Sequence, residues 1–203
     1  MKIIVIGGTG TIGKAVVNEL KQRHQVLVAG YKNGDVQVDI NDPHSIENMY
    51  QSFKGDLDAV VATTGKVHFD DLYKMTANDY HVGLNSKLMG QVNLVLIGMR
   101  YIKENGSFTL TSGILNHDPI VSGSSAAMVN GALEGFVKGA AIEMPKKMRI
   151  NLVSPTVVTE AMGVYGDYFR GYESVSAAQV ALAYSKSVEG AQNGQVYKVG
   201  YSG

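Results

Sequence analysis

The chain alternates short, continuous apolar runs with longer segments in which apolar residues recur at helical spacing. The run KIIVIG, residues 2–7, is typical of a strand buried on both faces of a parallel sheet. The segment TIGKAVVNELKQRH, residues 11–24, has the spacing of an amphipathic helix. Strands are predicted at 2–7, 25–30, 35–40, 57–65, 106–113, 149–155 and 194–200. Helices are predicted at about 11–24, 42–53, 78–104, 123–143 and 176–190.

The order of these elements predicts the fold. Helices that link buried strands imply right-handed crossovers, and therefore a doubly wound parallel sheet of about seven strands in a three-layer αβα arrangement. We expect one Rossmann-type domain over residues 1–203. Ligands of such sheets bind at the carboxyl ends of the strands. Six segments are expected to converge there: Gly7–Gly13, Gly30–Lys32, Asp39–Ile40, Ala62–Lys66, Thr111–Gly113 and Ser154–Thr159.

Composition narrows the function classes. Lys plus Arg equals Asp plus Glu, 18 against 18, so nothing favours nucleic acid or an anionic membrane as a partner. The absence of cysteine excludes disulfides, thiolate nucleophiles and cysteine-bound metal, and agrees with a cytoplasmic protein. No apolar run has the length of a signal peptide core or a membrane span. His44, His68, His81 and His117 lie on separate elements, so no metal site is predicted.

The sequence GGTGTIG, residues 7–13, follows a predicted strand and opens a predicted helix. Gly7 would permit the tight turn, Gly10 would let backbone amides approach a pyrophosphate, and Gly13 would let the helix pack closely on the sheet. The alternative is an ordinary glycine-rich turn, but this strand–turn–helix setting favours dinucleotide binding. The cofactor contacts expected in this loop are Gly7, Thr9, Gly10, Thr11, Ile12 and Gly13.

The end of the second predicted strand bears on the choice of cofactor. An acidic residue there would bind the ribose of NAD, whereas a basic residue would meet the 2′-phosphate of NADP. The chain has Tyr31 and Lys32, and no acid before Asp35. We therefore expect NADP, with NAD possible, although Lys32 can equally be read as a solvated turn residue beside Asn33.

Along almost its whole length the chain resembles the short-chain dehydrogenase/reductase family. The resemblance rests on GGTGTIG, on Asp39, on ATTG (62–65), TLTSG (109–113), NGALEGF (130–136), RINLVSPTVVTEAM (149–162) and GQVYKVG (194–200). It implies that Ser112 stands at the catalytic serine of the family. It also implies cofactor contacts at Asp39, Ile40, Thr63, Gly65, Pro155 and Thr159.

The catalytic Tyr-x-x-x-Lys of the family is altered. Aligning NGALEGF places Ala126 at the tyrosine and Asn130 at the lysine, and aligning KLMGQVNL (87–94) places Lys87 at the asparagine of the family. This exchange of lysine and asparagine resembles the ketoreductase domains of polyketide synthases. It implies that Ser112, Lys87 and Asn130 form the catalytic set. The alternative is that Lys87 only solvates its helix and Asn130 only caps a local turn.

Alanine cannot protonate the alkoxide formed by hydride transfer, a step worth about 10² to 10⁴ in rate. Ser112 could still donate to the oxygen, and Lys87 could supply positive charge or a proton. Other candidates lie in the loops of the same edge, each with an ordinary structural role as the alternative: Lys66, His68, His117, Tyr165, Tyr168 and Tyr172. The sequence YQSFK (50–54) also reads Tyr-x-x-x-Lys, but we interpret it as amphipathic helix spacing.

Two functions are carried forward. The first is an NADP(H)-dependent oxidoreductase of short-chain type that acts on a small carbonyl or hydroxyl compound. The second is a non-catalytic NAD(P)-binding sensor or regulatory protein. The helices over 78–104 and 123–143 are rich in small and apolar residues, as helix–helix interfaces are. Related proteins pair through these helices, so a homodimer or homotetramer is expected, with a monomer as the alternative.

Overall fold

In the computed structural model, which describes residues 1–202, seven parallel strands form one sheet in the order β3-β2-β1-β4-β5-β6-β7. The doubly wound α/β fold expected from the sequence is confirmed. The strands are β1 (Lys2–Ile6), β2 (Gln25–Gly30), β3 (Val36–Gln37), β4 (Ala59–Ala62), β5 (Ser107–Thr111), β6 (Arg149–Pro155) and β7 (Val196–Val199). β1, β4, β5 and β6 are almost fully buried, as their continuous apolar runs require.

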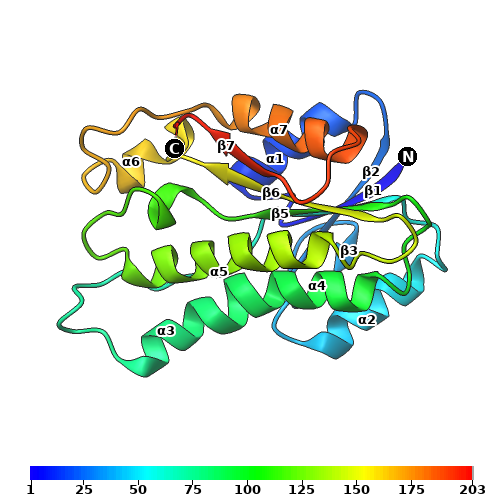
Figure 1. Cartoon of the computed structure of the whole chain (residues 1–203), viewed down its shortest axis with the longest axis horizontal. Coiled ribbons are helices and arrows are strands. Elements are labelled where there is room, and N and C mark those ends of the chain that lie inside the picture. The colour runs from blue at the N-terminus through cyan, green and yellow to red at the C-terminus, as the bar shows by residue number, and fades with distance from the viewer. Residues whose placement is uncertain (203) are drawn as a thin grey trace.

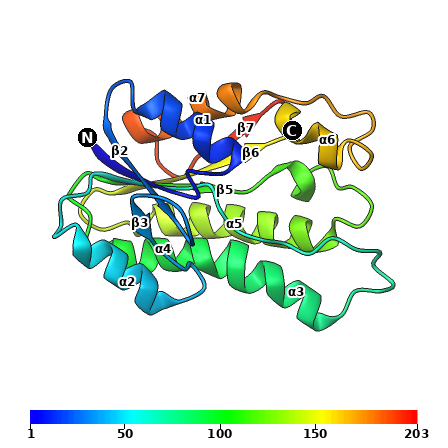
Figure 2. The same cartoon turned by 180° about the vertical axis from the view of Figure 1, so that it is seen from behind.

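Helices cover both faces of the sheet (Figures 1 and 2). One face carries α1 (Thr11–Leu20) and α7 (Ala177–Glu189), and the other carries α2 (Pro43–Ser52), α4 (Gly90–Gly98) and α5 (Ser124–Ala141). The caps agree with the sequence signals. The Asp42 carboxylate accepts a hydrogen bond from His44 N at 2.9 Å before Pro43, and Ser176 forms a capping box with Gln179 at the start of α7.

The helix predicted over 78–104 is not a single α-helix. It begins as α3 (Ala77–Gly83), passes through a π-helical turn, η1 (Leu84–Met89), and continues as α4 only to Gly98. It ends at Gly98, which packs against buried Tyr50 and Phe108, and Tyr101 N then bonds the Gly98 carbonyl where the chain turns. A π-helical turn in the middle of a helix is uncommon and often marks a functional position.

Short helices add to the carboxyl edge of the sheet. They are η2 (Ile114–Asn116), η3 (Thr159–Ala161) and α6 (Met162–Tyr165), which are too short to produce a readable period. Figure 1 shows α6, the loop before α3 and the loop before α5 gathered at one end of the molecule. Beneath them lies a small apolar cluster of Ile114, Leu115, Ala126, Val157 and Phe169.

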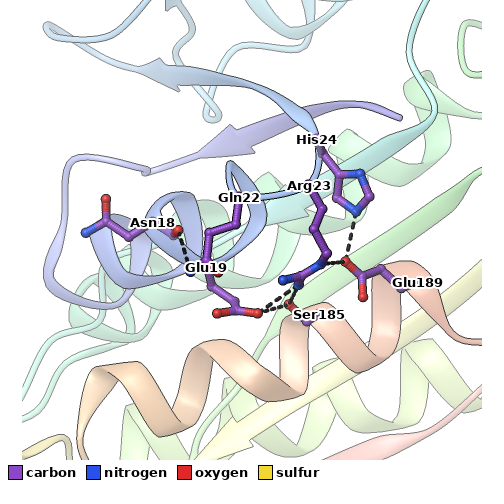
Figure 3. Close-up of polar contacts among 7 residues, drawn as sticks. All are labelled: Asn18, Glu19, Gln22, Arg23, His24, Ser185 and Glu189. Carbon is purple, nitrogen blue, oxygen red and sulfur yellow. Dashed lines mark hydrogen bonds and ion pairs between the residues drawn. The ribbon is translucent and has the colours of Figure 1, made fainter.

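On the face of the sheet that α1 and α7 cover, a network of charged side chains joins the ends of these two helices (Figure 3). Arg23 Nε donates to Glu189 Oε1 at 2.9 Å, and Arg23 Nη2 donates to Glu19 Oε1 at 2.8 Å. His24 Nε2 lies 2.8 Å from the same Glu189 oxygen, and Ser185 Oγ donates to Glu19 at 3.1 Å. We call these five residues the α1–α7 clip.

Candidate functional site

The turn between β1 and α1 forms a close-packed cradle. Gly7 has φ +80°, which favours glycine, and Gly10 N donates to the Gly7 carbonyl at 3.0 Å. A Cβ on Gly13 would clash with the carbonyl oxygen of Gly7, so α1 can approach the loop only with glycine there. The first amides of α1 therefore face the turn without a side chain between them, as binding of a pyrophosphate requires.

A cleft of about 610 Å³ opens beside this cradle. It brings together eight of the predicted cofactor residues: Gly7, Thr9, Gly10, Tyr31, Asp39, Ile40, Thr63 and Gly65. It is also lined by residues that the sequence reading had not singled out as cofactor contacts: Ile6, Gly30, Val38, Asn41, Thr64, Lys66 and Ser86. These come from strand ends and from η1, whose contribution was hidden inside the predicted long helix.

The other predicted cofactor residues take different places. Thr11 and Ile12 open α1, and Lys32 is exposed in the loop after β2. Pro155 is buried at the end of β6. Thr159 donates its backbone N–H to the Val175 carbonyl at 2.9 Å, which ties the two ends of the 160–175 segment together.

Asp39 stands at the rim of the cleft in a fixed orientation. Its carboxylate accepts bonds from Asn41 N and Asn41 Nδ2, both at 2.9 Å, and its own N–H donates to Ser45 Oγ at 2.9 Å. The carboxylate is therefore held in place by its own loop. A ligand in the cleft would meet an acceptor that needs no reorganisation.

Lys87, Asn130 and the end of β5 meet in one hydrogen-bonded group. Lys87 Nζ donates to Asn130 Oδ1 at 2.7 Å and to the Ser112 carbonyl at 3.1 Å. Asn130 Nδ2 donates to the Gly113 carbonyl at 3.1 Å. The ammonium and the amide thus bind each other and together fix the backbone that carries Ser112. Lys87 is therefore not simply a solvated helix residue, and Asn130 does more than cap a local turn.

The charge of Lys87 has no compensating acid. No Asp or Glu of residues 1–202 forms an ion pair with it, and both of its acceptors are neutral. Lys87 is partly buried as a residue, but its ammonium end lies deeper, and burial lowers the pKa of Lys87 to about 8. In a substantial fraction of the protein molecules, the Lys87 side chain would therefore be neutral at slightly alkaline pH.

Gln91 joins the segments that carry Lys87 and Ser112. It is fully buried, and its Nε2 donates to the Thr111 carbonyl at 2.9 Å and to the Lys87 carbonyl at 3.0 Å. Its Oε1 accepts from Thr111 N at 2.8 Å. The sequence reading missed this residue, although a glutamine within the apolar stretch GQVNLVL was a usable signal.

Ala126 faces away from solvent, with 2% of its surface exposed, in the apolar cluster with Ile114, Leu115, Val157 and Phe169. Ser112 is also buried, with 6% exposed. The position aligned with the tyrosine of the family is therefore packed under the 160–175 segment. Phe169 of that segment lies directly in this packing.

Several of the other candidate proton donors have partners of their own, and two are simply exposed. His117 Nε2 lies 2.8 Å from Glu134 Oε2, and Tyr172 donates to the carbonyls of Asp118 and Pro119 at 3.2 Å. His68 lies 3.9 Å from Asp79 Oδ1. Tyr165 contacts the ring of Phe69, Tyr168 is exposed, and Lys66 lines the cleft as an exposed residue. Tyr50 of YQSFK is fully buried and donates to the Leu94 carbonyl at 2.7 Å, so it serves the core.

Residues 1–202 show neither a metal-ligand cluster nor a candidate membrane span. No group of three His, Asp or Glu side chains lies close enough there to hold a metal ion. No helix in the same residues is both long and apolar enough to cross a bilayer.

Comparison with known proteins adds independent findings. A family model described as "Enoyl-(Acyl carrier protein) reductase" matches residues 8–198. The chain is 49% identical to lin1944 of Listeria innocua, whose crystal structure superposes with a TM-score of 0.96 and matches 98% of this chain and 99% of that one. A small-chain dehydrogenase in complex with NADPH is 25% identical, with a TM-score of 0.86 over 98% of this chain and 96% of that one.

A curated relative agrees with these structures. Versicolorin reductase stcU of Emericella nidulans is 26% identical over 212 residues, covering 88% of this chain and 78% of its own length. The family match over residues 8–198 covers most of the glycine cradle and the segments that carry Lys87 and Asn130. The chain belongs to the short-chain dehydrogenase/reductase family.

Proposed function

We propose that this protein is an NADP(H)-dependent oxidoreductase that reduces a small carbonyl compound or oxidises the corresponding alcohol. One observation carries the proposal: Lys87 Nζ, bonded to Asn130 Oδ1 and to the Ser112 carbonyl, places an uncompensated cation at the strand end next to the cofactor cleft. An uncompensated buried cation costs stability, so its retention favours a role in chemistry.

The residues of the cleft fit a dinucleotide. Gly7, Gly10 and Gly13 would hold the pyrophosphate at the start of α1, and Asp39 would bind the adenine end. Tyr31 and Lys32 at the end of β2 favour the 2′-phosphate of NADP, although NAD stays a candidate. A similar small-chain dehydrogenase binds NADPH, which supports this choice. When bound, the dinucleotide supplies or accepts the hydride.

The chain's own residues would then act on the substrate oxygen. Ser112 would donate a hydrogen bond that orients the carbonyl. Asn130 and the Ser112 carbonyl hold the Lys87 ammonium in place, and its positive charge would stabilise the developing oxyanion. Such a donor is typically worth about 10² to 10³ in rate. This set, with Ala126 at the position of the tyrosine, is the exchanged arrangement proposed from the sequence.

A second function has its own supporting observation. Ala126 and Ser112 are both buried, and Phe169 packs in the same cluster as Ala126. A protein that keeps the dinucleotide cleft and covers the reaction side with apolar residues fits a sensor that binds NAD(P) without turning it over.

Loss of NADPH absorbance with a panel of aldehydes, ketones and quinones would separate the two functions. The enzyme is expected to consume NADPH, and Ser112→Ala should lower the rate at least about tenfold while NADPH binding stays unchanged. Ser185→Ala, in the α1–α7 clip, is the matched control with an unchanged rate. Tight NADPH binding without consumption would favour the sensor.

We also propose that two copies of the chain associate through α4 and α5, in a homodimer or a homotetramer, within the cytoplasm. An apolar groove of about 570 Å³ lies between these helices, lined by residues that include Leu96, Phe136, Ala140 and Ile142. Ile142 is 87% exposed, which a contact with a second copy would relieve. Light scattering should give a dimer or tetramer for the wild-type protein, and Ile142→Glu should reduce its mass.

A further inference from the structure

We propose that Lys87 is the general acid of this enzyme: its Nζ delivers the proton that the substrate oxygen takes up after hydride transfer. The inference rests on the proposed oxidoreductase function. It goes further in naming the proton donor, a role that the Tyr-x-x-x-Lys arrangement of the family gives to its tyrosine and that Ala126 cannot perform.

The geometry of the ammonium supports this role. An ammonium has three N–H donors, and within residues 1–202 two of them are accounted for by Asn130 Oδ1 at 2.7 Å and the Ser112 carbonyl at 3.1 Å. The third donor is left for a ligand. Nζ bonds the Ser112 carbonyl, so the ammonium adjoins the residue that carries the proposed orienting hydroxyl.

The local backbone holds Nζ in that position. Lys87 lies in the π-helical turn η1, and its carbonyl accepts from Gln91 Nε2, which also bonds Thr111. On the other side, a Cβ on Gly65 would lie 2.6 Å from Lys87 Cα, so the cofactor turn after β4 packs directly on Lys87. The lysine is thus held between the strand end, the cofactor turn and α5.

The surroundings leave the proton ready to transfer. The titratable groups on the segments packed against η1 are Lys66 after β4, Asp79, Tyr80 and His81 on α3, and Glu134 and Lys138 on α5. Lys66 and His81 are exposed, and the Glu134 carboxylate bonds Asn116, His117 and Lys138. None of them is a cause of the lowered pKa of Lys87, which comes from burial. An ammonium with a pKa near 8 is a stronger acid than a free tyrosine hydroxyl.

Nearby tyrosine hydroxyls are occupied. Tyr184 OH lies 2.6 Å from Thr111 Oγ1, and burial raises its pKa well above the usual value. Tyr201 OH lies 2.5 Å from Ser154 Oγ, Tyr172 bonds two backbone carbonyls, and Tyr80 OH lies 2.9 Å from Ser124 Oγ. These four hydroxyls already have partners, and Lys87 Nζ is the acidic group bonded to the backbone just after β5.

The proposed step balances. The carbonyl carbon receives a hydride from the reduced dinucleotide, and the electron pair of the C=O π bond moves to oxygen. That oxygen then forms an O–H bond with a proton from Lys87 Nζ, whose N–H bond breaks to leave a neutral amine. The amine regains a proton from solvent before the next turnover. In alcohol oxidation the same amine accepts the proton.

Lys87→Arg and Asn130→Asp test the proposal together. Arginine keeps the charge and the hydrogen bonding but cannot release a proton near neutral pH. We expect Lys87→Arg to bind NADPH like the wild type and to lose about 10² to 10⁴ in turnover. Asn130→Asp would place a carboxylate against Nζ and raise the pKa of Lys87, so the fall of the reduction rate above pH 8 should move up by about one pH unit or more. The new carboxylate should also raise the pH at which Lys87 itself titrates.

NMR of ¹³C-labelled lysines gives a readout that is independent of turnover. The Lys87 signal, assigned by its loss in Lys87→Arg, should titrate near pH 8 in the wild type and at higher pH in Asn130→Asp. Two results would overturn the acid role alone. The first is a Lys87→Arg variant whose turnover lies within about threefold of the wild type. The second is an Asn130→Asp variant whose pH–rate profile is unchanged although the NMR titration of Lys87 shifts. A wild type that binds NADPH but reduces no carbonyl would remove the proposed function as well.

Discussion

The α1–α7 clip and the Lys87 site lie on opposite faces of the sheet and differ in how their charges are paired. In the α1–α7 clip, Arg23 meets Glu19 and Glu189 at 2.8 and 2.9 Å, so each charge has a counter-charge (Figure 3). At Lys87 the cation meets only an amide oxygen and a backbone carbonyl. Paired surface charges cost little and contribute modestly to stability, whereas a buried unpaired cation is unfavourable for folding.

The pKa shifts follow from this difference. The hydrogen bond from Arg23 lowers the pKa of Glu19. Burial raises the pKa of Glu189, but hydrogen bonds from Arg23 and His24 outweigh it, so the pKa of that carboxyl is lowered overall. Burial lowers the pKa of Lys87 to about 8. The clip therefore stabilises the ionised state of its side chains, and the Lys87 site destabilises it, which separates a structural network from a candidate catalytic group.

The largest expected effect is at Gln91, which supports the Lys87 site. Gln91→Leu should lower the free energy of unfolding by about 3 kcal/mol, because Thr111 N, Thr111 O and Lys87 O would lose buried partners. Denaturant unfolding measures the loss. Gln51→Leu, whose weak 3.5 Å contact with Tyr101 is exposed, is the control and should change little. If both variants lost the same free energy of unfolding, the hydrogen bonds of Gln91 would have no special role in this site.

Gln91→Glu tests whether the hydrogen bonds of Gln91 also position Ser112 and Lys87, the proposed catalytic residues. A glutamate of the same length keeps the Thr111 N bond and loses the two donors to Thr111 O and Lys87 O. We expect NADPH binding to persist and kcat to fall more than KM rises, since Ser112 and Lys87 are displaced rather than removed. A change confined to KM would mean that Gln91 acts on binding alone.

The fold could be predicted closely because each buried strand and each cap has a local signature. The run KIIVIG, the pair Asp42–Pro43 and the glycines of 7–13 each determine their own structure. The family resemblance implied that Lys87 faces the site, but the apolar pattern alone does not show it, because Lys87 lies in a π-helical turn and such a turn has no distinct apolar period. The expected roles of Ser112, Lys87 and Asn130 stay predictions, although the three segments do meet.

The region of η2, η3 and α6 was harder to predict for a different reason. The short helices η2, η3 and α6 are held by long-range contacts, such as Phe169 against Ala126 and Thr159 N to the Val175 carbonyl. Such contacts leave no periodic signal in their own segment. The small apolar cluster around Ala126 therefore forms only when residues from four separate regions of the chain come together in space.

The next expected effect is a pH dependence of stability at Lys87. The shift from 10.5 to about 8 corresponds to about 3 kcal/mol, at about 1.36 kcal/mol for each pKa unit. Between these pH values the unfolded chain binds more protons than the folded one, so stability should rise with pH. The free energy of unfolding of the wild type should therefore gain up to about 3 kcal/mol relative to Lys87→Met between pH 8 and 10.5. A constant difference between the two proteins would show that Lys87 keeps an ordinary pKa.

The smallest expected effect is in the α1–α7 clip, and its pH dependence has the opposite sign. Glu19 and Glu189 have lowered pKa values, so their contribution to stability is present above the pKa of an unfolded glutamate and is lost as the pH falls through the folded values. Arg23→Gln should lower the Tm by about 2 °C at pH 7, and the difference from the wild type should vanish near pH 3. Calorimetry at both pH values measures it, with Arg100→Gln as a control outside the clip. A difference that persists in acid would mean that Arg23 stabilises through packing of its aliphatic stem, and the contrast with Lys87 would then rest on burial rather than on pairing.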